Sequence, residues 1–309
     1  MFGVRGGRVT QIHVHIDDPD SFRAALDTAR GGDTINLRSG EYPFRIDTYD
    51  GPIHGGTSWS TKLTIRAYKP RGKPPERVVL RPVGGQYVVR FAEAVSRYIE
   101  LRNLDLDASL VELMAIKLSR RGGLPENAAS HIRFVECDIH GALHSGCHDG
   151  NETGIEFIRC RVFANGTRPE SAQNLDHGLY LGGPNVKVID CDVFFNGASG
   201  IKLNNGSAPT TNGSRVIGNR CWSNGANGRV GAGILVSTGT GQRIEGNECW
   251  GNDIGIQVNR DAVGAALKRN SLGPCRPCLP GQTTGRIYIF PEAQASTVLG
   301  TGIDANVEV

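Results

Sequence analysis

Short segments in which apolar and polar residues alternate recur along the middle of the chain. HIRFVECDIHG, IEFIRCRVFANG, VKVIDCDVFFNG and SRVIGNRCWSNG align with one another, and QRIEGNECWGN and ALKRNSLG continue the series. Successive repeats are 23, 31, 28, 28 and 23 residues apart, which is the length of one solenoid turn with variable loops. The alignment places Cys or Asn in one column, which consists of Cys137, Cys160, Cys191, Asn219, Asn247 and Asn270.

A second column follows a Gly and holds apolar residues. Because side chains on a strand alternate between two faces, each rung is predicted to supply two short strands with apolar residues pointing inward. The two columns together predict an all-β parallel β-helix. The second column begins at Ile116 and continues through Cys147, Leu179, Ile201, Ile234 and Ile256.

The Cys and Asn columns are interpreted as core ladders. Stacked Asn amides can bond to each other and to turn backbone, and Cys is small and apolar enough for the same slot. Cys221 and Cys249 are predicted to form a neighbouring inward column with Val162 and Val193. Cys275 and Cys278 differ, because the CRPC segment lies in a Pro-rich turn. A disulfide or two free thiols are expected there rather than half of a zinc site.

The segment DPDSFRAALDTARGGDTINLRSGEY predicts a short helix followed by a strand. Asp20 or Ser21 is the expected N-cap, and Phe22, Ala25, Leu26 and Ala29 form one apolar face. Such a helix would cover the open end of a solenoid core. LTIRAYKP and RVVLRPVG are predicted early strands, and YIELRNLDLD the first full rung. We expect one domain over 1–309, with the cap and first strand at 13–40, regular rungs at 97–273 and a closing segment at 274–309.

Composition narrows the function classes. The 42 Gly show no three-residue period, so a collagen helix is excluded. The net charge of +3 is too mild to indicate nucleic-acid binding. No apolar run is long enough for a membrane helix, and the N-terminal segment lacks the apolar core of a signal peptide.

The segment FRAALDTARGGDTINLRSGEY resembles the N-terminal cap and first strand of pectate lyase-like parallel β-helix proteins. The later rungs, with their Asn-Gly and Gly-Ile spacing, resemble the repeats of the same superfamily, so the resemblance covers roughly 13–290. It implies a single right-handed parallel β-helix with a capping helix, and a secreted or periplasmic protein. The absence of a signal-like segment leaves the cytoplasm open.

The superfamily includes polysaccharide lyases, glycoside hydrolases, uronan epimerases and phage adhesins, so the fold does not determine the activity. The chain lacks the paired-Asp and Gly-His-Gly motifs of pectin hydrolases and the Asp-Pro-His motif of uronan epimerases. A clear acidic cluster for calcium is also missing, which leaves a calcium requirement open. The resemblance implies an anionic polysaccharide as the partner, with no nucleic acid or membrane, and a monomer or homo-oligomer.

Residues one position past the second column should point outward on successive strands. Neighbouring strands lie about 4.8 Å apart, so His148, Tyr180 and Lys202 are expected within roughly 10 Å on one face. Such a strip of basic and aromatic groups indicates a binding or catalytic surface. The full outward column is Lys117, His148, Tyr180, Lys202, Leu235 and Gln257.

Asp176 and His177 follow the insertion GTRPESAQNLD and precede the rung that carries Tyr180. Asp176 could orient His177 and keep it basic, although a simple turn would also use an Asp in this way. His140, His144, His148 and Asp149 are close in sequence, so a metal site is a second interpretation. The catalytic candidates are Asp176, His177, Tyr180, Lys202 and His148. The substrate-binding candidates are Lys117, His144, Asp149, Arg215 and Asn204, with Arg243 weaker.

The leading hypothesis is a polysaccharide lyase that cleaves a uronic-acid polymer by β-elimination. This reaction needs a base near C5, an acid for the leaving oxygen and a cation on the carboxylate. His177 or Lys202 is the predicted base, Tyr180 the acid, and a Lys or Arg the cation; a C5-epimerase would use the same groups.

Two further hypotheses stay open. A hydrolase needs two carboxylates, and Asp149 with Asp176 is the pair that the sequence offers. A non-catalytic carbohydrate-binding or adhesin-like solenoid would use exposed aromatic residues, for which Trp222 and Trp250, expected in turns, are the candidates.

Overall fold

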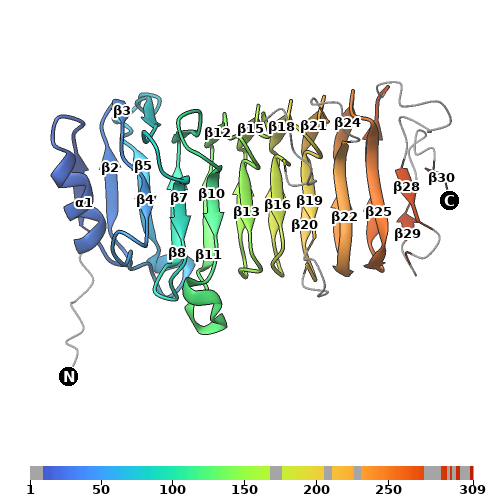
Figure 1. Cartoon of the computed structure of the whole chain (residues 1–309), viewed down its shortest axis with the longest axis horizontal. Helices are drawn as coiled ribbons and strands as arrows, with labels where there is room; N and C mark the ends of the chain where they lie inside the picture. Colours follow the sequence, from blue (N-terminus) through green and yellow to red (C-terminus); the bar gives the residue numbers. More distant parts are fainter. Residues whose placement is uncertain are drawn as a thin grey trace.

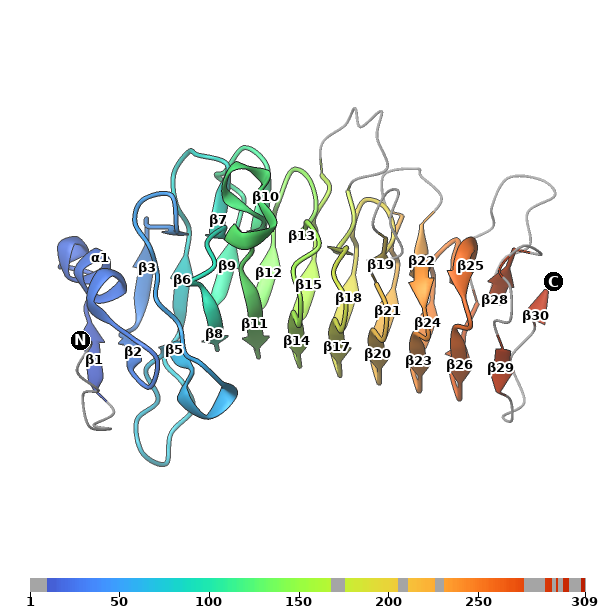
Figure 2. The same cartoon turned by 90° about the horizontal axis from the view of Figure 1, so that it is seen from below.

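The computed structural model describes residues 10–167, 176–204, 211–225, 231–274, 287–290, 293, 297–299 and 307–308. Short strands line up rung after rung along the long axis of the molecule, with one helix at the N-terminal end (Figures 1 and 2). Within the described residues, all strand pairs in the ladders are parallel, and they form three long sheets, which we name A, B and C. The chain is therefore a parallel β-helix, as the repeat pattern predicts.

Sheet A contains eleven of the described strands. They are β1 (Gln11–Val14), β2 (Thr34–Leu37), β5 (Leu63–Ala67), β8 (Arg97–Arg102), β11 (Ser130–Val135), β14 (Glu156–Ile158), β17 (Lys187–Ile189), β20 (Arg215–Ile217), β23 (Arg243–Glu245), β26 (Ala266–Lys268) and β29 (Thr297–Leu299).

Sheet B contains nine of the described strands. They are β3 (Gly40–Tyr42), β6 (Val78–Leu80), β9 (Asp105–Asp107), β12 (Asp138–His140), β15 (Arg161–Phe163), β18 (Asp192–Phe194), β21 (Arg220–Trp222), β24 (Glu248–Trp250) and β27 (Ser271–Leu272).

Sheet C contains ten of the described strands and carries the predicted outward column. They are β4 (Ile46–Asp47), β7 (Tyr87–Phe91), β10 (Met114–Leu118), β13 (Cys147–Asp149), β16 (Leu179–Leu181), β19 (Ile201–Leu203), β22 (Ala232–Thr240), β25 (Ile254–Val263), β28 (Ile287–Ile289) and β30 (Val307–Glu308). Three short 3₁₀ helices lie in loops: η1 (Trp59–Thr61), η2 (Arg121–Gly123) and η3 (Pro125–Asn127).

Each regular turn of the solenoid supplies three strands, so the prediction of two strands per rung is wrong. The repeated segments continue from sheet A into sheet B through a sharp bend at one residue with positive φ, such as Glu136 (φ 53°) or Asp190 (φ 52°). A single left-handed residue redirects the chain without interrupting the alternation of apolar residues. The three-strand turns also start earlier than YIELRNLDLD, with β2, β3 and β4.

The Cys and Asn column is a buried ladder at this bend, as predicted. The backbone N–H of Cys191 donates to Oδ1 of Asn219 at 2.9 Å, and the amide of Asn219 donates to Asn247 at 2.9 Å. Asn247 bonds to Asn270 in the same way. The six cysteines that the structure describes are buried free thiols, so they act as core residues. Cys221 pairs in register with Val193 and Cys249, which confirms the neighbouring column. Cys275 and Cys278 lie outside the described residues.

A second Asn ladder, which the alignment did not assign, forms the turn from sheet B to sheet C. This ladder is buried, and each side-chain Nδ2 donates a hydrogen bond of 3.0 Å to Oδ1 of the next residue in the series. The series consists of Asn165, Asn196, Asn224 and Asn252. The Gly residues before β13, β16 and β19, and Gly233 in β22, pack directly on this ladder. A Cβ on Gly200, for example, would lie 2.8 Å from Nδ2 of Asn224. The recurring Asn-Gly and Gly-Ile pairs therefore reflect one packing arrangement.

The helix α1 (Pro19–Thr28) covers the N-terminal end of the core. Its N-cap is Asp18, whose side chain accepts from the backbone N–H of Ser21 at 3.1 Å. The predicted caps Asp20 and Ser21 are wrong, because Pro19 suits the first helical position and shifts the start toward the N-terminus. The predicted apolar face is buried; it consists of Phe22, Ala25, Leu26 and Ala29.

Candidate functional site

The predicted outward column lies on sheet C in the expected register. Lys117 pairs with His148, His148 with Tyr180, and Tyr180 with Lys202. We call these four residues the central strip. Leu235 and Gln257 continue the column on β22 and β25. Apart from Asp149, the inward neighbours of the strip are buried apolar residues, so the core fixes the direction of each side chain.

Side chains of the central strip contact one another across the rungs. Nζ of Lys117 lies 3.2 Å from Nδ1 of His148, and the ring of His148 meets the ring of Tyr180 edge-on at 4.9 Å. Nζ of Lys202 lies 5.0 Å from the centre of the Tyr180 ring. Asn204, which follows β19, donates from Nδ2 to Oη of Tyr180 at 2.6 Å. An oxygen that accepts this bond keeps its own proton for a second partner.

Burial shifts the proton equilibria of the strip. It lowers the pKa of Lys202 and of Lys117 below the usual lysine value. Burial and the nearby charge of Lys117 lower the pKa of His148 to about 3, so this ring is neutral at physiological pH. Partial desolvation favours the neutral amine, which is the form that accepts a proton.

Two carboxyl groups lie beneath the strip. Asp149 points inward, and its carboxylate accepts backbone N–H bonds from Glu152 at 2.8 Å and Gly183 at 2.9 Å. Glu152 is fully buried, with Nε of Arg120 at 3.5 Å from its carboxyl group. Burial, followed by the neighbouring Asp149, raises the pKa of Glu152 to about 9. Asp149 therefore braces the loop after β13 instead of facing a substrate.

Asp176 and His177 are also buried, with at most 2% of either residue exposed. Nδ1 of His177 accepts from the backbone N–H of Ser199 at 3.1 Å, and its ring lies 5.5 Å from that of Tyr180. Nδ1 of His144 is 3.9 Å from Asp176. These groups support the start of the sheet C strands from beneath, so direct contact of His177 or Asp176 with a polymer is disfavoured.

Arg215 and Arg243 do not reach the central strip. Both begin strands of sheet A, where they pair with each other in register, while the strip lies on sheet C. The repeat pattern assigns each arginine to a rung. It does not assign the arginine to a sheet, because that depends on the bends between strands. His140 is likewise separate, because it lies on sheet B and its Nε2 is 2.8 Å from Asp105.

The side chains of the predicted metal site therefore point to different places. The site would have consisted of His140, His144, His148 and Asp149. Among the residues that the structure describes, no group of three or more His, Cys, Asp or Glu is arranged to hold a metal ion. No described helix is long and apolar enough to cross a membrane.

Trp222 and Trp250 lie at the ends of strands β21 and β24 and not in turns as predicted. They belong to a stack on sheet B in which adjacent ring centres are 4.3 to 5.1 Å apart and nearly parallel. Because the faces between successive rings are covered, the stack offers ring edges along its length instead of flat platforms for sugar rings. Its members are His140, Phe163, Phe194, Trp222 and Trp250.

The outward column also extends toward the N-terminus, which the sequence alignment missed. Arg90 pairs with Lys117 on one side and with Asp47 on the other. Its guanidinium donates to both oxygens of Asp47, at 2.8 and 2.7 Å, and lies 3.8 Å above the ring of Tyr49. The alternation in YVVRF could have identified this strand and its outward Arg90. Long loops separate these strands, however, and hide the repeat.

Comparison with known proteins supports the fold. A family model described as a right handed beta helix region matches residues 109–241. Comparison with curated protein sequences finds no significant match. The described chain is a right-handed parallel β-helix, and solved structures of a pectate lyase and an alginate lyase share this fold.

Several solved structures share this architecture at low sequence identity. An alginate lyase from Paenibacillus sp. str. FPU-7 has a TM-score of 0.62 and 15% identity, and the match covers 93% of this chain and 99% of that one. Pectate lyase Pel9A has a TM-score of 0.54 and 14% identity, with coverages of 92% and 75%. A pectin methylesterase from Aspergillus niger has a TM-score of 0.52 and 11% identity, with coverages of 98% and 93%. At such identities the likeness establishes the fold alone.

Proposed function

We propose that the protein is a polysaccharide lyase that cleaves a uronic-acid polymer by β-elimination on the outer face of sheet C. The observation that carries the proposal is the contact between Lys202, Tyr180 and Asn204 within the registered central strip. Two of the structural neighbours are named as lyases of pectate and alginate, which are both acidic polymers. Most of those neighbours are carbohydrate-active enzymes.

Lys202 is the proposed base. Its lowered pKa leaves more of the amine neutral at a given pH, and neutral amine is what removes the proton from C5. Lys202 lies on the rung beside Tyr180 and is partly open to solvent. His177, the other candidate base, is disfavoured by its burial and by the bond to Ser199.

Tyr180 is the proposed acid. Asn204 donates to its oxygen, which leaves the phenolic proton free to move to the leaving oxygen of the glycosidic bond. Lys117, on the other side of Tyr180 with His148, is the proposed cation for the uronate carboxylate, because the negative charge of Asp149 opposes the lowering of the Lys117 pKa by burial. The proton from C5 goes to Lys202, the C4–oxygen bond breaks, and a C4–C5 double bond forms.

Competing functions make different use of these residues. Hydrolysis is disfavoured because both carboxylates of its proposed pair, Asp149 and Asp176, are buried and cannot flank a glycosidic bond. Binding without catalysis is disfavoured because the aromatic stack on sheet B is closed on its faces. Epimerisation would use the same central strip. It is distinguished from elimination by its product, a polymer of altered uronate composition.

The test is incubation with pectate, alginate and glycosaminoglycans, followed by ultraviolet absorbance of the unsaturated uronate. We expect product with wild type and a loss of about 10²-fold or more with Tyr180→Phe, since an acid catalyst contributes about 10²–10⁴. Tyr288→Phe is the matched control, because Tyr288 lies in the same outward column two rungs beyond Leu235.

Three outcomes would contradict elimination. New reducing ends without unsaturation would indicate hydrolysis, and altered uronate composition without cleavage would indicate epimerisation. Binding to a polymer with no chemical change would indicate a carbohydrate-binding solenoid.

A further inference from the structure

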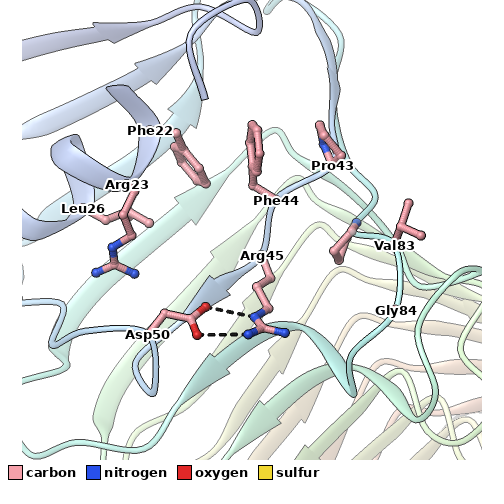
Figure 3. Close-up of a pocket in the computed structure, with 10 residues that line it drawn as sticks. Phe22, Arg23, Leu26, Pro43, Phe44, Arg45, Asp50, Val83 and Gly84 are labelled. Atoms are coloured by element: carbon pink, nitrogen blue, oxygen red, sulfur yellow. Dashed lines mark hydrogen bonds and ion pairs between the residues drawn. The ribbon is translucent and has the colours of Figure 1, made fainter. Parts of the chain in front are cut away.

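A cavity of about 260 Å³ lies at the N-terminal end of the molecule, where α1 meets the turns from sheet B to sheet C. Figure 3 shows Phe22 and Leu26 from α1 on one side and Val83 with Gly84 on the other. Phe44 and Arg45 lie between them, on the segment that joins β3 to β4. The volume is just below the range of drug-sized sites, roughly 300–1,000 Å³, so it suits one small ring.

The cavity has an aromatic wall with a polar group beside it. Phe44 is half-buried, and its ring centre is 6.3 Å from that of the buried Phe22. Arg45 donates from Nε and Nη2 to the two oxygens of Asp50, both at 2.9 Å. A carboxylate has about four lone-pair sites, so Asp50 can still accept hydroxyl donors while the guanidinium offers its remaining N–H groups.

Charge at the cavity is balanced. Arg45 is paired with Asp50, and Arg23 is paired with Asp27. The Arg45 guanidinium holds the pKa of Asp50 below its usual range, so the carboxylate stays ionised. Paired groups of this kind recognise neutral hydroxyls rather than a bare anion, and the apolar wall suits the C–H face of a sugar ring.

The cavity borders the N-terminal end of the outward column on sheet C. Nε of Arg45 is 3.6 Å from Asp47, which is the first outward residue of sheet C. Asp47 pairs in register with Arg90, and Arg90 with Lys117. Three strand spacings of about 4.8 Å separate Asp47 from His148, roughly 14 Å. A polymer that lies along the strip toward the N-terminal end would therefore extend to the cavity.

We infer that this cavity is a distal subsite that binds one pyranose ring of the polysaccharide, through Phe44 and the Arg45–Asp50 pair. The inference rests on the proposed function, because the same polymer occupies the strip. The subsite adds affinity only for chains long enough to span both places. It also makes the N-terminal end of the solenoid part of the substrate surface.

The experiment measures calorimetric Kd values for oligogalacturonates and oligomannuronates from dimer to octamer, with every protein carrying Tyr180→Phe so that cleavage is slow during the titration. The protein with no further change should show a drop in Kd of about tenfold between chains that are too short and chains that reach the cavity. That is the effect expected of one well-formed polar contact with ring stacking. Asp50→Ala should remove the drop and leave the affinity for short chains unchanged.

Phe44→Ala is a second variant that tests the ring without touching the ion pair. Asp138→Ala is the matched control, because Asp138 pairs with Arg161 at 3.2 Å and has an exposure similar to that of Asp50. This control should keep the length dependence. Equal loss of affinity for short and long chains, or no effect of Asp50→Ala on long chains, would overturn the subsite.

Failure of the proposed function has a different signature. If no oligosaccharide of any length binds to wild type, both the lyase proposal and the subsite fail. If short chains bind and are cleaved while no length dependence is present, the lyase proposal stands and the subsite alone is refuted.

Discussion

Burial changes the proton affinity of Lys202 and of Glu152 in opposite ways. A buried amine loses its proton more easily, whereas a buried carboxyl group holds its proton more tightly. The lowered pKa of Lys202 favours the role of base that we propose for it, and the raised pKa of Glu152 keeps this carboxyl group neutral below the strip. Both effects come from the same cause, which is the removal of water by the stacked rungs.

For Lys202, we predict that kcat/KM rises with pH as the amine loses its proton, with a midpoint below the usual lysine pKa of 10.5. Lys202→Arg keeps the positive charge but cannot supply a neutral base at these pH values. Turnover should fall about 10²-fold or more. The measurement is the pH profile of kcat/KM on the best polymer. A Lys202→Arg variant with wild-type turnover would exclude Lys202 as the base.

For Glu152, the prediction concerns stability. Its pKa is about 9 in the folded state against 4.5 for the free group, so the folded protein binds this proton more tightly. The contribution to stability is fully present below pH 4.5 and is lost as pH rises toward 9. Between the pKa of the free group and pH 7, the difference in pKa lowers the free energy of unfolding by at most about 3 kcal/mol.

Glu152→Gln carries no such proton. The variant should gain up to about 2–3 kcal/mol in the free energy of unfolding relative to wild type at neutral pH, and less near pH 5. Urea denaturation at both pH values measures the difference. Glu112→Gln is the control, because Glu112 is exposed. A gain that is equal at both pH values would show that Glu152 does not titrate as described.

At the scale of single elements, glycines serve the turns for two different reasons. Gly200 must lack a side chain, since a Cβ would lie 2.8 Å from both Nδ2 of Asn224 and the carbonyl of Gly233. Gly246 instead adopts a φ of 63° with open space around it. Its equivalents in other turns are ordinary residues with positive φ, such as Glu136 and Asp190.

We therefore predict that Gly200→Ala costs about 1–3 kcal/mol or more through overpacking, whereas Gly246→Asn is nearly neutral because Asn tolerates the left-handed region. The measurement is urea unfolding of the two variants under identical conditions. If Gly246→Asn is the more damaging change, packing on the second Asn ladder does not explain why glycine recurs at the start of the sheet C strands.

The repeat pattern predicted the strands, their register and both inward columns, because each depends on alternation within a few residues. It did not predict the third strand per turn, because the bend at residues such as Asp190 leaves the alternation intact. For the candidate site, the register placed Lys117, His148, Tyr180 and Lys202 together. It could not detect the burial of Asp149 and Asp176 or the separation of Arg215, since these depend on which way the chain bends between sheets.

For the molecule as a whole, an open end is the main weakness of a solenoid, because each rung covers only its neighbours. The N-terminal end is closed by α1, whose Phe22 is 2% exposed and lies 6.1 Å from the ring of Tyr42. The same helix forms one wall of the cavity proposed as a distal subsite. Under the subsite proposal, this one helix would both cover the end of the core and contact the substrate.

We predict that Phe22→Asp detaches this cap. The substitution places a charge in an apolar contact, which the protein can relieve only by exposing the end of the core. Exposed strand edges then pair between molecules, so light scattering should detect concentration-dependent association. Asp20→Ala is the control, because Asp20 is on the same helix and exposed. A Phe22→Asp protein that stays monomeric, with unchanged unfolding, would mean that the rungs are stable without their cap.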